Sequence, residues 1–308
     1  MKIAVLGGGA MGSLYGGYLS RQHDVLIVDV KETLAKKING EGLLIHEPDG
    51  SSALYHPRAA VRTEGETPAD LVIVFVKSLF SRSALTANRS LIGPDTLLMT
   101  LQNGSGHEQT LLDFVDREHV VIGTTQHNSA VVGLAEIRHG GSGMTHLGCI
   151  AGDVGRLAPV AQALSSCGLE ADCCPNVQEL IWNKMFTNIS ASVLTGVLQV
   201  PMGYIVENEY AWSLCEQLIR EAVAVAAGEG LRFDAEEKIR EVRGVCEVSP
   251  GGLTSIYADL RRGRRTEVDT ISGSVVTASL RNGVPAPTHQ LMVTLVHAME
   301  GRPKDAEP

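Results

Sequence analysis

The chain has 308 residues, of which 44% are hydrophobic and 20% charged, and its formal net charge is −9. This length favours two domains, because globular domains usually hold about 100–200 residues. The negative charge argues against a nucleic-acid partner, and the lack of an apolar run of about 18 residues argues against a membrane span. We therefore expect a cytoplasmic globular protein with neither kind of partner.

The cysteine and histidine patterns bear on redox state and metal binding. Six cysteines show no CxxC pair or paired spacing, which is typical of free thiols in a reducing compartment. Ten histidines form no HExxH or HxH pattern, so we predict no metal site. The basic segment RRGRR at 261–265 is either a solvated loop or an anion-binding loop.

The N-terminus combines a predicted strand, Lys2–Leu6, with a glycine-rich turn and a predicted helix from about Ala10 to Ser20. This order is typical of a dinucleotide-binding βαβ unit. There, Gly7 would allow the tight turn, Gly9 would admit a pyrophosphate, and Gly12 would let the helix pack closely. The first N–H groups of the helix would face the phosphates. The residues predicted to contact the cofactor here are Gly7, Gly9, Ala10, Met11 and Gly12.

A second predicted strand, Asp24–Val28, is followed by Asp29. An acid about 20 residues after the first glycine commonly binds the ribose of a dinucleotide. The alternative is a glycine-rich turn with a surface aspartate. The full pattern favours the cofactor, so we predict a Rossmann-type domain that binds a nicotinamide dinucleotide.

The rest of the first half alternates strands and helices. Apolar runs predict strands at Leu71–Val76, Leu97–Leu101 and Val120–Gly123, with helices at Ser81–Leu91 and Leu157–Ser165. Lys77 and Asn103 follow two of these strands, where ligands bind in parallel sheets. Each is either an ordinary strand-end residue or a ligand contact. The glycine-rich segment 130–150 predicts an antiparallel extension, and Pro175 marks a domain boundary.

The second half shows helical spacing throughout. Helices are predicted at Val177–Thr195, Glu209–Ala227, Asp234–Val245, Glu267–Arg281 and Thr288–Met299. Asp234 with Glu237, and Thr266 with Asp269, have the spacing of capping boxes. Gly228, Gly283 and Gly301 fit helix C-termini. The predicted fold is therefore α/β, with a Rossmann-type domain at 1–175 and an all-helical domain at 176–308.

Polar residues on the first of these helices are candidates for chemistry. Lys184, Asn188 and Ser192 recur every four residues and would share one side of the helix. This row is either an ordinary solvated face or the surrounding of a partly desolvated lysine beside Trp182 and Phe186. Such a lysine can give a proton to an alkoxide.

Glu267 is the second candidate. In the first turn of its predicted helix, a carboxylate either favours the helix dipole or takes part in the chemistry.

Taken together, these segments resemble the ketopantoate reductase family, the 2-dehydropantoate 2-reductases, over nearly the full length. The matching strings are GGGAMG at 7–12, VFVKS around 77, LQNGSG around 103, LIWNKMFTN at 180–188, LTSIYADL around 255 and RRTEVD around 267. The resemblance implies NAD(P)H-dependent reduction of a 2-oxo acid to a 2-hydroxy acid. The expected substrate is ketopantoate, in pantothenate biosynthesis.

The resemblance also assigns roles to individual residues. Lys184 would be the general acid, and Glu267 would orient it or contact the cofactor ribose. Asn103 and Asn188 would position substrate and nicotinamide, and Ser255 would hold the substrate carboxylate. Lys77 would contact the cofactor.

Three substrate-site positions depart from the family pattern, since the family often has asparagine where this chain has Ser192, Met202 and Gly252. Ser192 stays a predicted substrate contact, but the site loses hydrogen-bond donors. A family paralogue acting on a different, less polar 2-oxo acid is therefore an alternative. A different two-domain dehydrogenase and a non-catalytic dinucleotide-binding sensor are further alternatives.

Cofactor choice is another departure. Many relatives have an arginine for the 2′-phosphate of NADP where this chain has Val30, which follows Asp29, although Lys31 comes directly after it. A carboxylate there would bond a ribose hydroxyl and repel a phosphate. We predict that NADH is used well and preferred, although NADPH is the family habit. The sequence leaves a homodimer open.

Overall fold

The computed structural model describes residues 1–302, which divide into two compact units. The first unit comprises 1–102 and 107–180, and the second comprises 103–106 together with the described residues from 181 onward. Within residues 1–302, no helix has both the length and the apolar character that a membrane span requires. The predicted fold class is confirmed, because an α/β unit with a mostly parallel sheet precedes an all-helical region.

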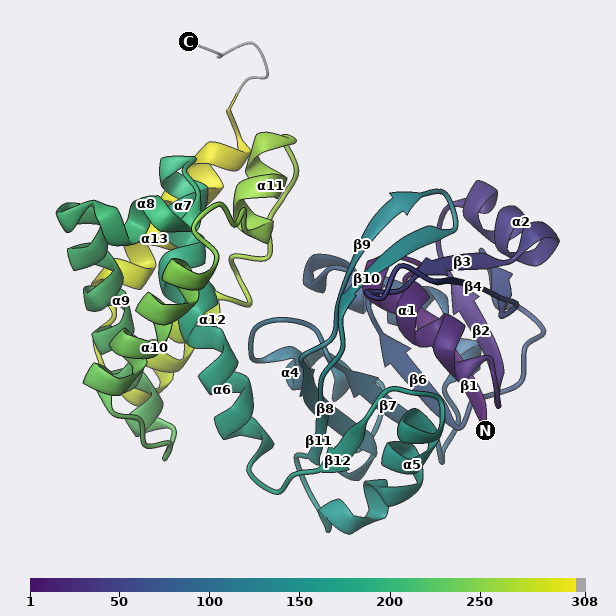
Figure 1. The fold of residues 1–308 in the computed structure, drawn as a ribbon. Coiled ribbons are helices and arrows are strands. Elements are labelled where there is room, and N and C mark those ends of the chain that lie inside the picture. Colours follow the sequence, from purple (N-terminus) through teal and green to yellow (C-terminus); the bar gives the residue numbers. More distant parts are fainter. Residues whose placement is uncertain (303–308) are drawn as a thin grey trace. The chain divides into compact units, whose positions relative to one another are not determined.

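The first unit is built on an eight-stranded sheet with the order β12-β11-β8-β7-β6-β1-β2-β5 (Figure 1). Its strands are β1 (Lys2–Leu6), β2 (Asp24–Val28), β5 (Arg58–Ala60), β6 (Leu71–Val74), β7 (Leu97–Thr100), β8 (Val120–Thr125), β11 (Thr145–Cys149) and β12 (Ala171–Cys173). Only the β8–β11 pair is antiparallel. Strand β6 is buried throughout and β1 is buried after its first residue, as their apolar runs predict.

Helices and short 3₁₀ turns connect these strands. The helices are α1 (Ala10–Leu19), α2 (Glu32–Glu41), α3 (Ser81–Ala87), α4 (His107–Leu111) and α5 (Ala158–Ser166). The 3₁₀ turns are Ser78–Phe80, Arg89–Leu91, Arg117–His119 and Val154–Leu157. The predicted helix Ser81–Leu91 thus ends early, at Ala87, and continues only as a 3₁₀ turn.

A second sheet of four strands has the order β4-β3-β10-β9. Its strands are β3 (Leu43–His46), β4 (Ser52–Tyr55), β9 (Asn128–Gly133) and β10 (Glu136–Gly141). The predicted antiparallel extension is partly wrong, because the β9–β10 hairpin pairs with β3 instead of extending the main sheet. Helix α1 packs against both sheets. A Cβ at Gly16 would lie 2.6 Å from Ile27 of β2, and one at Gly17 would lie 2.8 Å from Ile45 of β3.

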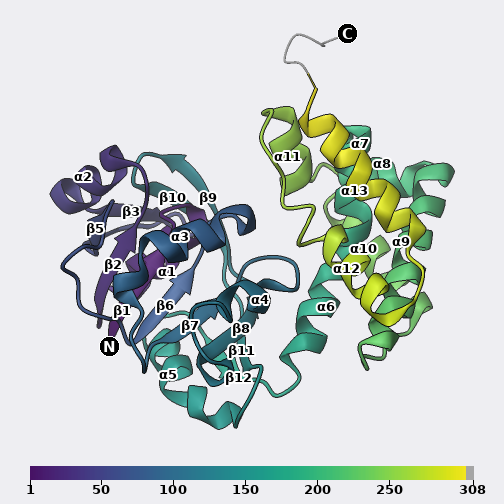
Figure 2. The same cartoon turned by 180° about the vertical axis from the view of Figure 1, so that it is seen from behind.

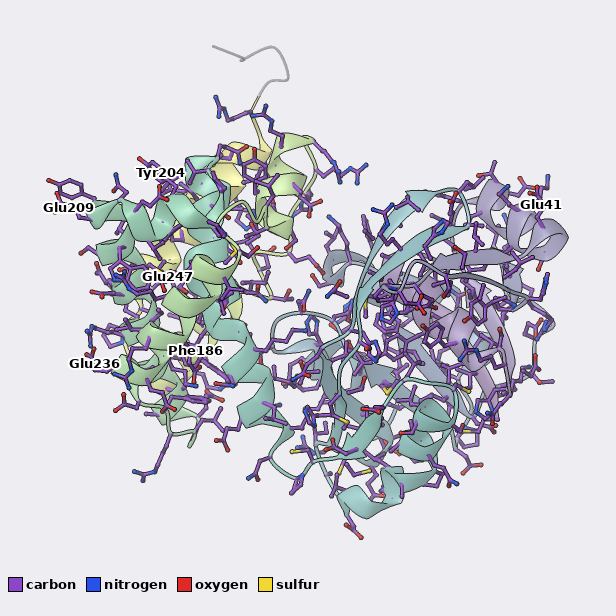
Figure 3. All side chains as sticks on the ribbon, viewed as in Figure 1. Glu41, Phe186, Tyr204, Glu209, Glu236 and Glu247 are labelled. Atoms are coloured by element: carbon purple, nitrogen blue, oxygen red, sulfur yellow. The ribbon has the colours of Figure 1, made fainter. Side chains whose placement is uncertain are left out.

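The second unit is a bundle of helices around α9. Its helices are α6 (Val177–Thr187), whose first turn belongs to the first unit, α7 (Val193–Leu198), α8 (Met202–Glu207), α9 (Glu209–Gly228), α10 (Ala235–Val248), α11 (Ser255–Arg261), α12 (Ser272–Asn282) and α13 (Pro287–Glu300). Seen from behind, α13 runs beside α12 (Figure 2). In Figure 3, Phe186 lies among the helices, whereas Glu209 and Glu236 project outward. Phe186 packs edge-on against Phe233, with ring centroids 5.1 Å apart.

Two helix predictions in this unit are wrong in detail. The predicted helix Val177–Thr195 is interrupted by a π-helical turn at Asn188–Ser192 and then continues as α7. The predicted helix Glu267–Arg281 begins only at Ser272. Thr266 does not cap it, because the residue at its N-cap is Ile271; the Thr266 N–H and hydroxyl instead donate to Glu300 of α13, each at 2.7 Å.

Other helix ends are as predicted. Asp234 caps α10 by accepting a hydrogen bond from the Glu237 N–H at 2.7 Å. Gly283 ends α12 in the left-handed conformation, with φ +68°.

The start of α13 is capped from another helix. Ala286 at its N-cap has no polar side chain, and Glu221 of α9 instead accepts from the Thr288 N–H, the Thr288 hydroxyl and the His289 N–H. We expect Glu221→Ala to lower the free energy of unfolding by about 1–2 kcal/mol, because these donors and the helix dipole lose their carboxylate. Urea unfolding measures this change. The matched control is Glu207→Ala on the exposed surface of α8, and equal effects of the two variants would contradict the capping role.

Candidate functional site

In the glycine loop after β1, an added Cβ would clash with the backbone at Gly7 and Gly12 but not at Gly9. Gly7 has φ +107°, and a Cβ there would lie 2.8 Å from the Val76 backbone nitrogen. A Cβ at Gly12 would lie 1.8 Å from the Gly7 carbonyl oxygen, so position 12, in the first turn of α1, admits only glycine. A Cβ at Gly9 would meet nothing within 4 Å. The loop therefore leaves room for a phosphate against the backbone at Gly9 and the first turn of α1, formed by Ala10 and Met11.

Asp29 lies against this loop. Its carboxylate accepts hydrogen bonds from the Gly8 N–H at 2.8 Å and from the Lys31 N–H at 2.9 Å. The fold thus brings the second-strand acid to the glycine turn, as the βαβ pattern predicts. Val30 is 89% exposed and carries no charge, whereas Lys31, the next residue, is an exposed cation.

Lys77 belongs to the same edge of the sheet. It is half-buried and precedes the 3₁₀ turn Ser78–Phe80, one residue after the Val76 backbone that contacts Gly7. Gln102, at the end of β7, donates from Nε2 to the Val76 carbonyl at 2.5 Å and accepts from the Thr100 hydroxyl at 2.8 Å. Gln102 is a supporting residue that sequence reasoning missed. Its only sequence signal is its place after a buried strand.

Within the second unit, the loop that carries Asn103 packs against the turn that carries Glu267. Gly104 has φ +101°, and a Cβ there would lie 2.1 Å from the Thr270 carbonyl oxygen. The same carbonyl accepts from the Ser105 N–H at 3.0 Å. Asn103 is exposed and Glu267 is half-buried. The structure therefore brings together two segments predicted to contact the cofactor.

The Glu267 turn is anchored on α13. Thr266 bonds to Glu300, and His297 lies 3.0 Å from Glu300 and 2.9 Å from Asp269. The hydrogen bond to Glu300 raises the pKa of His297, with a further contribution from Asp269. Burial alone would raise the pKa of Glu300, but its hydrogen bonds from Thr266 and His297 outweigh burial and lower it. The anchoring ionic pair thus persists from the acid side of neutrality upward until His297 loses its proton.

Of the predicted polar row, Lys184 lies on α6, whereas Asn188 and Ser192 lie on the π-helical turn that follows it. Asn188 is half-buried and Ser192 is buried, and the Ser192 hydroxyl lies 3.5 Å from the Asn188 side-chain oxygen. Trp182 and Phe186 pack into the helical core. Lys184 is exposed, yet the protein around its ammonium desolvates it enough to lower its pKa. π-helical turns are frequent at functional sites.

Ser255 is the first residue of α11 and is exposed. Thr254, which caps α11, also lies 3.3 Å from the Ser192 carbonyl oxygen. Ser255 and Ser192, two predicted substrate contacts, are therefore connected through one threonine. The sequence did not indicate this connection.

Two of the departures from the family pattern touch one another. The Met202 N–H donates to the Gly252 carbonyl at 3.1 Å, and a Cβ at Gly252 would lie 3.5 Å from the Met202 sulfur. That Cβ would also lie 2.7 Å from the Ser249 hydroxyl, so this backbone admits no asparagine at 252 without a shift. A thioether and a bare backbone thus occupy positions where the family often presents amides.

Family models match almost the whole chain. The model described as ketopantoate reductase PanE/ApbA matches residues 3–152, and its C-terminal counterpart matches residues 176–300. The chain belongs to the ketopantoate reductase family. It is an NAD(P)H-dependent oxidoreductase that reduces 2-oxo acids.

Individual relatives are about 30% identical. A 2-dehydropantoate 2-reductase of Halobacterium salinarum is 31% identical over 299 residues, covering 96% of this chain and 98% of the relative. One of Pyrococcus horikoshii is 30% identical and covers 97% and 98%. Among solved structures, a D-mandelate dehydrogenase with NADH and anilino(oxo)acetate superimposes with a TM-score of 0.89. It is 30% identical over 97% of this chain and 98% of that chain.

The residues present fit a nicotinamide dinucleotide, because the glycine loop is open at Gly9 and carries Asp29 beside it. Residues 1–302 contain no group of three or more His, Cys, Asp or Glu side chains that could hold a metal ion. All six cysteines are free thiols.

Proposed function

We propose that this reductase uses NADH to reduce a 2-oxo acid whose side group is less polar than that of ketopantoate. The observation that carries the proposal is the contact between Met202 and Gly252, which stand where the family often has asparagines. A buried polar substrate group without a partner costs about 1–3 kcal/mol, so a site without these amides favours an apolar group. The likeness to D-mandelate dehydrogenase supports the same substrate class.

In this proposal the first unit holds the cofactor. Gly7, Gly9, Gly12 and the first turn of α1, Ala10 and Met11, would bind the pyrophosphate, and Asp29 would accept from the ribose hydroxyls. Lys77 would add a positive charge at the same edge of the sheet. When bound, NADH supplies the hydride that reduces the substrate carbonyl carbon.

The second unit would hold and protonate the substrate. Ser255 would donate to the carboxylate, while Asn188 and Ser192 would position the carbonyl. Negative charge develops on the carbonyl oxygen as hydride arrives, and the Lys184 ammonium would stabilise that charge and then give the oxygen its proton. The desolvation that lowers the pKa of Lys184 makes it a better proton donor near neutral pH.

Ketopantoate is the second candidate substrate, because the curated relatives at 31% and 30% identity are 2-dehydropantoate 2-reductases. A panel assay separates the two candidates. The purified chain is tested with NADH against ketopantoate, 2-oxoisovalerate, phenylpyruvate and phenylglyoxylate. We expect kcat/KM for at least one of the three apolar acids to exceed that for ketopantoate by about tenfold or more, the effect of one lost hydrogen bond. A higher value for ketopantoate would reverse the order of the candidates.

Inactivity with all four acids would contradict the proposed substrate class. A cytoplasmic location and a homodimer both stay predictions.

We expect substitution of Glu267 to reduce activity measurably, but less than substitution of Lys184. The Glu267 turn packs on the Asn103 loop and is anchored by Glu300, which supports a role for the Glu267 carboxylate in orienting Lys184 or binding the cofactor ribose. We expect Glu267→Gln to lower kcat and raise the substrate KM, each by about three- to tenfold, as for one charged hydrogen bond. Steady-state kinetics measure both. Glu209→Gln, at an exposed acid of α9, is the matched control, and a normal rate in Glu267→Gln would leave Glu267 with a purely structural role.

A further inference from the structure

Two threonine hydroxyls join the helical segment after Lys184 to the helix that begins at Ser255. The Thr195 hydroxyl on α7 donates to the Ser192 carbonyl at 2.8 Å, and Thr195 is completely buried. The Thr254 hydroxyl lies 2.7 Å from that of Thr195 and 3.3 Å from the same carbonyl. All of these atoms belong to the second unit.

Each hydroxyl has one hydrogen, which restricts how the group can be satisfied. If Thr195 donates to Ser192, then Thr254 donates to Thr195, and the Thr254 oxygen still accepts from the Tyr257 N–H at 3.3 Å. Both hydroxyl hydrogens are then donated. Removing the Thr195 hydroxyl removes the shorter bond to the Ser192 carbonyl and leaves the Thr254 hydroxyl with only its longer, 3.3 Å contact to that carbonyl, while the cap on α11 remains.

The backbones around this pair leave little room for movement. Gly196 follows Thr195, and a Cβ there would lie only 2.4 Å from Ile256 Cγ2. Ile256 is buried and follows Ser255 directly. Helices α7 and α11 therefore pack closely where the two hydroxyls are hydrogen-bonded. A displacement of the π-helical turn would accordingly displace the start of α11.

We propose that Thr195 and Thr254 are positioning residues for the 2-oxo acid. They hold Ser255, the proposed carboxylate ligand, at a set place relative to Asn188 and Ser192 on the π-helical turn. The inference rests on the proposed function, because it concerns how that site binds its substrate. Small displacements matter here, since a ligand group must stay within about 0.5 Å of its productive position.

The test compares Thr195→Val with Thr195→Ser, which keeps the hydroxyl. The substrate is whichever acid of the panel the wild-type chain reduces fastest. We expect Thr195→Val to raise the KM of that acid about tenfold, with kcat and the KM of NADH changed less than about twofold. Thr195→Ser should restore the wild-type KM to within about twofold. A loss of thermal stability alone would not produce this split between the two KM values.

A double-mutant cycle with Ser255→Ala decides whether the effect passes through Ser255. In the Ser255→Ala background, Thr195→Val should raise the KM by less than about twofold. Independent, additive effects would overturn the inference, and so would a wild-type KM in Thr195→Val. If Thr195→Val fails to fold, Thr254→Asn replaces it, because asparagine keeps an N-cap acceptor for α11 while disturbing the contact with Thr195. A wild-type chain inactive with every acid would instead refute the proposed function.

Discussion

Replacing Lys184 by alanine is expected to lower kcat by about 10²–10⁴ while leaving the affinity for the dinucleotide nearly unchanged. Hydride transfer places negative charge on the substrate oxygen, and Lys184 is the cation proposed to stabilise that charge and supply the proton. Its partial desolvation strengthens this interaction relative to water. Steady-state kinetics with the best panel acid and fluorescence titration of NADH give the two quantities.

The matched control lies on the same helix. Glu179→Ala changes an exposed residue in the first turn of α6 and should leave kcat within about twofold of wild type. Lys184→Arg keeps the charge, but its guanidinium cannot release a proton near neutral pH, so we expect partial activity at most. An equal loss of NADH binding in Lys184→Ala would place the lysine in the cofactor site instead.

The pH dependence follows from the same group. A general acid must be protonated, so kcat should be constant at lower pH and fall as pH rises through the pKa of Lys184 in the complex. Desolvation lowers that pKa, so the fall should begin below the ordinary lysine value of 10.5. The residual activity of Lys184→Ala should lack this limb. A limb that survives in the variant would assign it to another group.

Replacing Asp29 by asparagine is expected to shift the ratio of kcat/KM for NADH to kcat/KM for NADPH by about 10- to 100-fold towards NADPH. The change removes the charge that would repel a 2′-phosphate, and a hydrogen bond to a charged group is worth about 1.5–3 kcal/mol. Asparagine keeps one oxygen able to accept from the Gly8 N–H, so the glycine loop should retain its shape. Wild type should prefer NADH.

A second substitution extends this test. Val30 is almost fully exposed beside Asp29, so Val30→Arg in the Asp29→Asn background should raise the preference for NADPH further. Val30→Ala is the control for the loss of valine and should leave the ratio unchanged. A wild-type preference for NADPH of tenfold or more would refute the role given to Asp29.

Local patterns were sufficient to predict the Rossmann core. Strands β1 and β2 run Lys2–Leu6 and Asp24–Val28, as predicted, because each is an apolar run between turn residues. The glycine loop was equally predictable, since the roles of Gly7 and Gly12 depend on backbone contacts within one βαβ unit. The cap of α10 at Asp234 depends only on a neighbour three residues away.

Features that depend on distant partners could not be predicted. Strands β3 and β4 are too short to show a pattern, so the sheet that β9 and β10 join was not foreseen. His127 and His139 show no sequence motif, yet their rings stack 5.3 Å apart in the first unit. The bond between Thr266 and Glu300 was likewise hidden, because the two residues are 34 positions apart in the sequence.

The amino-acid sequence by itself determined the family, the α/β and helical halves, and the residue types available for hydride and proton transfer, because short-range spacing carries all of these. Only the tertiary structure decided how the site is supported. It joined Asn103 to the Glu267 turn, and it tied Ser192 to α11 through two threonines. These arrangements depend on hydrogen bonds between segments that meet only when the chain is folded, and no local pattern encodes them.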